Sequence, residues 1–259
     1  MRPTLAFLNL MPNKIDTERQ WLKLVEPTRN NINWQPFITE SYQPKSTDIS
    51  LLLPRYCVGK PAQFDALIIT GAPLGRTPYQ DVKYWGELAA LFDFCIEHRI
   101  PMFCSCWAAN AYLYAKYQLT PNIRSEKLFG VFEHKQSQHH PVLNGLEPSI
   151  WLPQSRYAFI DPDEIKQHEH IEPLLEVPNE GPAMLIDQHE TLLLLAHPEY
   201  AEDTLQNEYK RDQRSGLATK PPVWQKPSPN SETSNQLPYW QLNGRTILEN
   251  WLQFALRSR

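Results

Sequence analysis

Residues 102–117 read MFCSCWAANAYLYAKY, an apolar run that becomes a helical pattern at two cysteines. The run predicts a buried strand that ends near Cys106 and is followed directly by a helix. A nucleophile on such a sharp turn is exposed at the sheet edge, and the turn needs small residues two positions to either side. Cys106 has Cys104 before it and Ala108 after it, which favours Cys106 as a nucleophile and Cys104 as a small core residue. The alternative is an inert core segment, the commoner role of an isolated cysteine.

Similar apolar runs lie on both sides of this stretch. Residues 4–10, 64–70 and 192–196 are predicted as further buried strands, and residues 16–26, 81–98 and 245–259 as helices. Continuous apolar strands separated by helices indicate an α/β fold, with a parallel sheet covered by helices on both faces. The length of 259 residues predicts a single domain that spans residues 1–259.

The carboxyl ends of the predicted strands indicate where a ligand would bind. The strand at residues 192–196 runs directly into His197, Pro198 and Glu199, so His197 is a candidate base and Glu199 a candidate orienting group. The loops LMPNK and GAPLG follow two other strands. Residues 214–238 are rich in Pro, Ser and Asn, which predicts a long loop that could cover the site.

Composition narrows the class of partner. The formal net charge is −4 and no basic block is present, which argues against nucleic-acid and membrane-surface partners and favours a small molecule. Four cysteines in a chain of this length do not form a disulfide framework, so a reducing cytoplasm fits best. No spacing typical of a zinc site is present, and no metal is expected.

Several separated motifs resemble one known family, the homoserine O-acyltransferases. In chain order they are LNLMPNKIDTERQWLKL, LIITGAPLG, DVKYWGEL, CWAANAYLY, EKLFGVFEH, LPQSRY and HPEYAEDTLQNEYKRD, between about residues 5 and 252. The resemblance implies a flavodoxin-like fold similar to class I glutamine amidotransferases and a Cys-His-Glu triad. It also implies a homodimer without a bound cofactor, which uses acyl-CoA as a co-substrate and acylates the hydroxyl of a small amino acid.

Matching each motif position gives the implied site residues. Cys106 resembles the acyl-accepting nucleophile, His197 the general base and Glu199 the orienting carboxylate. Lys14 matches an active-site lysine of the family. The substrate-contacting positions are matched by Lys127, Ser155 and Arg211, and the position that selects the acyl donor is matched by Gly75. An arginine suits a bidentate grip on the acceptor carboxylate, although Arg211 alone could simply pair with Glu208 on a solvated helix.

The motifs are compatible with two acyl donors and two acceptors. The family carries Gly at the position of Gly75 in succinyl users and Glu in acetyl users, so Gly75 favours succinyl-CoA over acetyl-CoA. Three residues depart from the family pattern near the acceptor, namely Asn110, Gln154 and Ala196. L-homoserine, for methionine biosynthesis, and L-serine, for cysteine biosynthesis, are therefore both considered. Two further alternatives are a glutaminase of the amidotransferase type and a non-catalytic relative.

Overall fold

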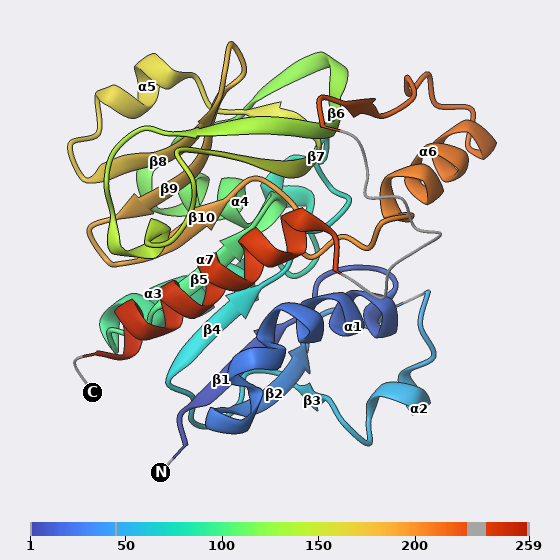
Figure 1. Ribbon diagram of the computed structural model, residues 1–259. Helices are drawn as coiled ribbons and strands as arrows, with labels where there is room; N and C mark the ends of the chain where they lie inside the picture. The colour runs from blue at the N-terminus through green and yellow to red at the C-terminus, as the bar shows by residue number, and fades with distance from the viewer. Residues whose placement is uncertain (1, 45, 227–236, 258–259) are drawn as a thin grey trace.

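The computed structural model describes residues 2–44, 46–226 and 237–257. In this part of the chain eleven strands form one sheet, in the order β11-β6-β8-β9-β10-β5-β4-β1-β2-β3 with β7 paired to β6 (Figure 1). The strands are β1 (Thr4–Leu8), β2 (Asn33–Ile38), β3 (Cys57–Val58), β4 (Ala66–Ile69), β5 (Met102–Ser105), β6 (Asn122–Gln136), β7 (Ser149–Phe159), β8 (Ile171–Val177), β9 (Gly181–Asp187), β10 (Leu192–Leu194) and β11 (Val223–Trp224). The α-helices are α1 (Lys14–Val25), α2 (Ile49–Leu52), α3 (Trp85–Glu97), α4 (Trp107–Tyr117), α5 (Pro162–Lys166), α6 (Thr204–Arg214) and α7 (Tyr239–Leu256). Three short 3-10 helices are η1 (Glu26–Asn31), η2 (Tyr79–Asp81) and η3 (Pro141–Leu143).

One half of the sheet is parallel and buried on both faces. Strands β10, β5, β4, β1, β2 and β3 all run in the same direction. Side chains alternate along β1, so Leu5 and Phe7 enter one core cluster while Ala6 and Leu8 enter the other. Because both faces of this strand are apolar, both must be covered. The predicted α/β fold with a doubly covered parallel sheet is confirmed.

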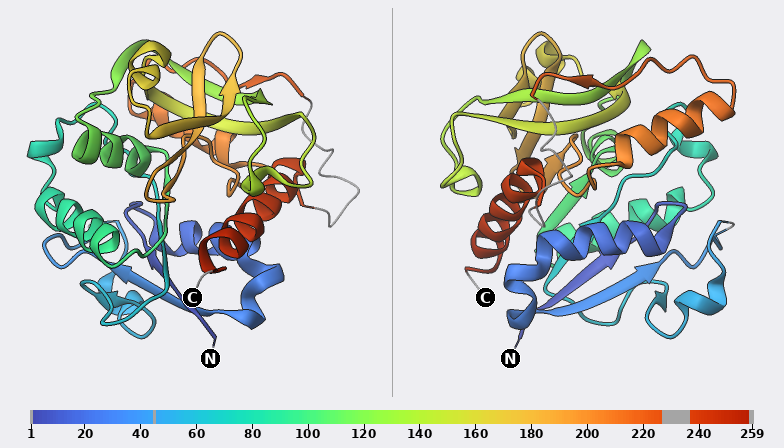
Figure 2. Two further views of the ribbon diagram at one scale, coloured as in Figure 1. Left: turned by 90° about the vertical axis from the view of Figure 1, so that its left-hand side faces the viewer. Right: turned by 45° about the vertical axis from the view of Figure 1, so that its right-hand side comes forward.

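Helices cover the two faces of this parallel half in pairs. On one face, α1 and α7 lie side by side, and Trp21 and Trp251 both pack edge-on against Phe103, with ring centroids 5.6 and 5.4 Å away (Figure 2). On the other face, α3 and α4 pack through Phe92 and Tyr112, whose ring centroids are 5.2 Å apart. No helix in the described ranges is both long enough and apolar enough to pass through a bilayer.

The other half of the sheet is antiparallel, and the sequence patterns did not predict it. Strand β6 pairs antiparallel with β7 and β8, and β9 pairs antiparallel with β8 and β10. Strand β7 mixes buried and partly exposed positions, and β6 is partly or fully exposed over its first six residues, so neither is a continuous apolar run like the parallel strands. Their pairing depends on contacts between distant segments, which a local pattern does not encode. This half carries two of the predicted substrate-contacting residues, because β6 includes Lys127 and β7 includes Ser155.

Two predicted helices have different starts in the structure. The helix predicted from residue 81 begins at Trp85, after the 3-10 turn η2. The C-terminal helix α7 begins at Tyr239, well before residue 245, and Pro238 is its N-cap residue. The extra first turn of α7 carries Trp240 and Gln241, both of which contact the candidate site described below.

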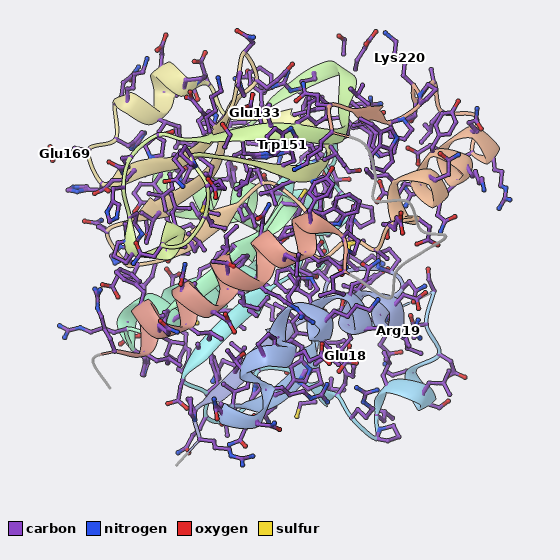
Figure 3. All side chains as sticks on the ribbon, in the orientation of Figure 1. Glu18, Arg19, Glu133, Trp151, Glu169 and Lys220 are labelled. Atoms are coloured by element: carbon purple, nitrogen blue, oxygen red, sulfur yellow. The ribbon has the colours of Figure 1, made fainter. Side chains whose placement is uncertain are left out.

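The predicted loop at residues 214–238 contains a short strand. After α6 ends, Val223 and Trp224 pair parallel with Gly130 and Val131 of β6. The side chain of Gln225 accepts a hydrogen bond from the backbone N–H of Glu133, a residue labelled in Figure 3, at 2.8 Å. Residues 227–236 lie outside the described residues, so their role as an active-site cover stays a prediction.

Docking of β11 requires glycine at position 130. Gly130 has φ +142°, and a Cβ there would overlap the backbone carbonyl oxygen of Val223. We expect Gly130→Ala to detach β11, and the amides of residues 217–226 to lose at least about tenfold of their protection from hydrogen exchange. Gly145→Ala is the matched control, because Gly145 also has a positive φ, +76°, but a Cβ at this position would meet open space. Unchanged protection in Gly130→Ala would contradict this account.

Candidate active site

Cys106 occupies a strained turn between β5 and α4. Its backbone has φ 48° and ψ −107°, an unusual conformation for a residue with a side chain. The Cys106 N–H donates to the Leu194 carbonyl at 2.6 Å, which ties the turn to the end of the neighbouring strand β10. The turn leaves Cys106 partly exposed while Cys104, inside β5, is fully buried. This is the geometry that a nucleophile at the edge of a sheet needs.

Gly71, at the start of the GAPLG loop, lies against both Cys106 and His197. A Cβ at position 71 would lie 3.3 Å from the Cys106 Cβ and 3.8 Å from the His197 Cε1. The carboxyl ends of β4, β5 and β10 therefore meet at this point. The cysteine and the histidine, about ninety positions apart in sequence, are brought together by three neighbouring parallel strands.

His197 is held between a carboxylate and the Cys106 side chain. Its Nδ1 lies 2.8 Å from the Glu199 Oε1, and both residues are buried, at 4% and 5% exposure. Burial alone would lower the pKa of His197, but the charges and hydrogen bonds of Cys106 and Glu199 outweigh it and raise that pKa well above its usual value. The arrangement therefore favours an imidazolium beside the sulfur, as expected for a cysteine nucleophile with a histidine base.

The first turn of α4 follows Cys106 directly. No side chain caps this helix end, so its leading N–H groups are available to a negative charge that develops near the sulfur. The helix dipole acts in the same direction. Among the described residues, no three His, Cys, Asp or Glu side chains gather as they would to hold a metal ion.

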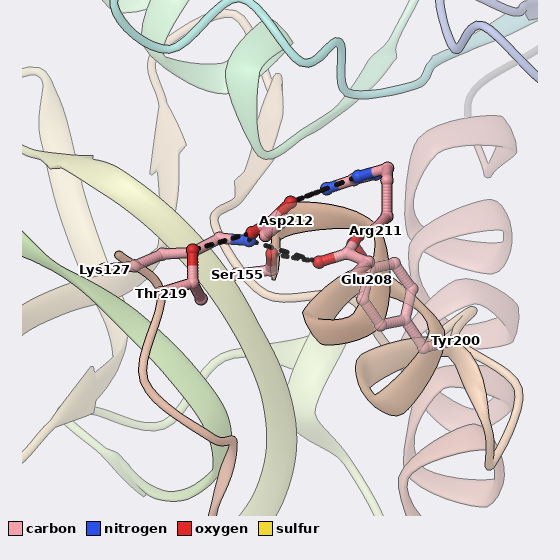
Figure 4. A network of polar contacts seen from close by, with 7 residues as sticks. All are labelled: Lys127, Ser155, Tyr200, Glu208, Arg211, Asp212 and Thr219. Atoms are coloured by element: carbon pink, nitrogen blue, oxygen red, sulfur yellow. Dashed lines mark hydrogen bonds and ion pairs between the residues drawn. The ribbon is translucent and has the colours of Figure 1, made fainter. Parts of the chain in front are cut away.

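A second polar cluster surrounds Glu208 of α6 (Figure 4). Its carboxylate accepts hydrogen bonds from the Ser155 hydroxyl at 2.6 Å and the Tyr200 hydroxyl at 2.7 Å, and lies 3.4 Å from the Lys127 Nζ. Burial would raise the pKa of Glu208, but Lys127 and the two hydroxyl donors outweigh it and lower that pKa below its usual value. Glu208 is therefore a largely buried carboxylate that stays charged at neutral pH.

Asp212 is the second carboxylate of the cluster. It lies 3.3 Å from the Lys127 Nζ and 2.8 Å from an Arg211 guanidinium nitrogen, and it accepts from the Thr219 hydroxyl at 2.9 Å. The side chain of Arg211 remains 56% exposed. The sequence spacing offered Glu208 as an ion-pair partner of Arg211. This alternative is wrong, because the guanidinium binds Asp212 instead. Lys127, Ser155 and Arg211, predicted as substrate contacts, do lie together here.

Tyr200 connects the two clusters. Its ring stacks on the His197 imidazole with centroids 4.3 Å apart and planes inclined by 22°, and its hydroxyl reaches Glu208. Neither Tyr200 nor Glu208 was predicted as a site residue. Both lie inside the motif HPEYAEDTLQNEYKRD, but only the path of the chain from β10 into α6 shows that they face each other.

Lys14 and Gly75 lie in loops that follow β1 and β4. Lys14 is 5% exposed, its Nζ donates to the Met11 carbonyl at 2.8 Å, and burial lowers the pKa of this amine to about 8. Gly75 has open space around it, and the next residue, Arg76, places its guanidinium 4.0 Å from the centre of the Tyr157 ring. Among the described residues, no hydrogen bond or ion pair joins Lys14 or Gly75 to the triad. Their catalytic and selective roles stay predictions.

The chain is similar to one family of proteins along almost its whole length. A family model described as homoserine O-succinyltransferase matches residues 2–259. A homoserine O-succinyltransferase of Shewanella baltica is 35% identical over 254 residues, covering 95% of this chain and 80% of the relative. One from Shewanella piezotolerans is 33% identical over 253 residues, with the same coverage of 95% and 80%.

Solved structures give the fold independently. A glutamine amidotransferase from Thermotoga maritima superposes with a TM-score of 0.65 at 7% identity, covering 100% of both chains. A glutamine amido transferase from Methylobacillus flagellatus gives a TM-score of 0.65 at 12% identity, covering 98% of this chain and 95% of that one. Identities this low show the shared fold alone, and they confirm the predicted likeness to class I glutamine amidotransferases.

Proposed function

The chain belongs to the homoserine O-succinyltransferase family, and from this premise we propose that it transfers the succinyl group of succinyl-CoA to the hydroxyl of L-homoserine, in methionine biosynthesis. The observation that carries the proposal is one continuous site. A Cys-His-Glu triad with a partly exposed sulfur is joined through Tyr200 to a largely buried carboxylate, Glu208, with Arg211 beside it. The first cluster suits acyl exchange and the second suits a zwitterionic acceptor.

In the first step, the Cys106 sulfur attacks the thioester carbonyl of the acyl-CoA. The new carbon–sulfur bond forms a tetrahedral oxyanion, which the N–H groups at the start of α4 stabilise. The bond to the coenzyme A sulfur then breaks, and the His197 imidazolium supplies the proton that yields free coenzyme A. Because one thioester replaces another, the acyl-enzyme forms at little thermodynamic cost.

In the second step, the acceptor hydroxyl attacks the Cys106 thioester. His197 removes the hydroxyl proton as the new carbon–oxygen bond forms, and Glu199 stabilises the imidazolium that results. The carbon–sulfur bond to Cys106 breaks, which releases the O-acyl amino acid and restores the thiolate–imidazolium pair. The hydroxyl must therefore reach the side of the imidazole opposite Glu199.

The Glu208 cluster matches the two charges of an amino-acid backbone. The charged and largely buried Glu208 suits the acceptor ammonium, and the partly exposed guanidinium of Arg211 suits the acceptor carboxylate in a bidentate contact. Lys127 lies between Glu208 and Asp212 and offsets their repulsion. The buried Tyr200 that separates Glu208 from His197 places the acceptor backbone close to the catalytic base.

Gly75 supports the choice of succinyl-CoA as the donor. A carboxylate at this position would repel the free carboxylate of a succinyl group, whereas glycine leaves space. We expect Gly75→Glu to lower kcat/KM for succinyl-CoA relative to acetyl-CoA by about tenfold or more, since one like-charge contact of about 1.4 kcal/mol has this effect. Gly86→Glu is the matched control, because Gly86 also has open space around it. An unchanged donor ratio in Gly75→Glu would remove Gly75 from donor selection.

The function is tested by pairing each donor with each acceptor. The purified protein is incubated with succinyl-CoA or acetyl-CoA and with L-homoserine or L-serine, while coenzyme A release and product mass are followed. O-succinylhomoserine as the main product supports the proposal. Product formed only from acetyl-CoA and L-serine would contradict the proposed donor and the proposed acceptor. Glutamine-dependent release of ammonia that exceeds acyl transfer would favour a glutaminase. A cytoplasmic homodimer stays a prediction.

A further inference from the structure

Tyr200 is buried between the triad and the Glu208 cluster. It is 4% exposed, with its ring face against His197 and its hydroxyl 2.7 Å from the Glu208 Oε1. Burial and the nearby carboxylates raise the pKa of Tyr200 well above its usual value, so its hydroxyl remains a neutral donor. One rigid ring therefore contacts both the catalytic base and the carboxylate proposed to bind the acceptor.

The start of α7 holds Tyr200 in this position. The Trp240 Nε1 donates to the Tyr200 carbonyl at 2.7 Å, and the Gln241 side chain donates to the carbonyls of Glu199 and Tyr200 at 3.1 and 3.0 Å. Gly244 packs so closely that a Cβ there would lie 2.5 Å from the Pro198 Cβ. The turn from His197 to Tyr200 is thus fastened to α7 by three hydrogen bonds and by close packing at Gly244.

Each contact of Tyr200 restricts one motion. The hydrogen bond from His197 to Glu199 leaves the imidazole free to tilt about that bond, and the stacked ring of Tyr200 limits the tilt. On the other side, Ser155 and Tyr200 donate to different oxygens of Glu208, which fixes the plane of its carboxylate. A ligand that moves or reorients Glu208 must therefore also act on the ring that rests on His197.

We propose that Tyr200 is a positioning residue that couples occupancy of the acceptor site to the orientation of the catalytic imidazole. This inference rests on the proposed function, because it assigns the acceptor to Glu208. It goes beyond that function in stating that the two half-reactions depend differently on one residue. The hydroxyl of Tyr200 serves the acceptor step, while its ring serves both steps.

Two variants separate the ring from the hydroxyl. In Tyr200→Phe, we expect the rate of Cys106 acylation without acceptor to stay within about twofold, while kcat/KM for the acceptor falls by about tenfold, the effect of losing one hydrogen bond to a charged group. In Tyr200→Leu, which removes the ring as well, the acylation rate should also fall by about tenfold. Rapid-quench mass measurement of acyl-Cys106 follows the first step, and product formation follows the second.

Tyr112→Phe is the matched control. The Tyr112 hydroxyl also donates from a buried ring to a buried carboxylate, Asp187, at 2.6 Å, but this pair belongs to neither cluster of the site. Tyr112→Phe should lose about as much thermal stability as Tyr200→Phe. It should not, however, slow the acceptor step relative to the acylation step. Equal losses in both half-reactions of Tyr200→Phe, or no loss in either, would overturn the coupling. Wild-type protein that transfers no acyl group to any acceptor would instead refute the proposed function, and the coupling with it.

A measurement on the wild-type chain covers the case in which the Tyr200 variants do not fold. L-2-aminobutyrate has the ammonium and carboxylate of L-homoserine but no hydroxyl that could touch His197. Its saturating addition should shift the NMR signal of the His197 ring, by coupling through Glu208 and Tyr200. Binding of this analogue that leaves the His197 signal unchanged would overturn the inference.

Discussion

Cys106→Ala should lose acyl transfer by a factor on the order of 10⁴ or more, because removing a nucleophile that forms a covalent intermediate disables both half-reactions. Incubation with acyl-CoA should also leave the intact mass of this variant unchanged, whereas the wild-type chain gains one acyl group. Coenzyme A release and intact mass are measured in the same samples. Persistent transfer, or an acyl adduct on another residue, would remove Cys106 from the mechanism.

The strained backbone of Cys106 adds a second expectation. Glycine adopts positive φ at little cost, so Cys106→Gly should abolish transfer and yet raise the free energy of unfolding by about 1 kcal/mol relative to Cys106→Ala. Chemical denaturation of the two variants measures the difference. Cys104→Ala, two residues earlier in β5, is the matched control, and it should keep wild-type transfer with a modest loss of stability, since Cys104 is fully buried.

Glu208→Gln should raise KM for the amino-acid acceptor by about 10- to 100-fold, because a hydrogen bond between two charged groups becomes one between a charged and a neutral group. The amide oxygen can still accept from one of the Ser155 and Tyr200 hydroxyls and its NH2 group can donate to the other, so most of the local packing remains. KM for the acyl-CoA and the rate of Cys106 acylation should change by less than about threefold, since the proposed mechanism gives this carboxylate no contact with the donor. Steady-state kinetics with each substrate varied in turn measures both.

Glu126→Gln is the control for the loss of a carboxylate on a surface. Glu126 pairs with Lys220 at 2.6 Å, and both side chains are largely exposed, so this change should leave both KM values unaltered. If Glu208→Gln raised KM for the acyl-CoA instead of the acceptor, the Glu208 cluster would belong to the donor. If neither KM changed, Glu208 would serve stability alone.

The parallel half of the fold was predictable because its strands and helices carry strong local signals. Buried strands such as β4 and β5 are continuous apolar runs, and each is followed by turn residues. The position of Cys106 at the end of β5 follows from the same pattern. The antiparallel strands β6 and β7 carry a weaker signal, since β7 mixes buried with partly exposed positions and the first six residues of β6 are partly or fully exposed.

The parallel α/β sheet, the strand-end positions of Cys106 and His197, and the pairing of His197 with Glu199 two residues later were all predictable from local patterns of residues. The contact of Arg211 with Asp212, the contacts of Glu208 with Ser155, Lys127 and Tyr200, and the stacking of Tyr200 on His197 emerge in the folded molecule alone. The difference lies in the range of the interactions. Apolar periodicity and turn residues act within one element, whereas the charges and hydroxyls of the Glu208 cluster meet only after β6, β7, α6 and the turn after β10 have packed together.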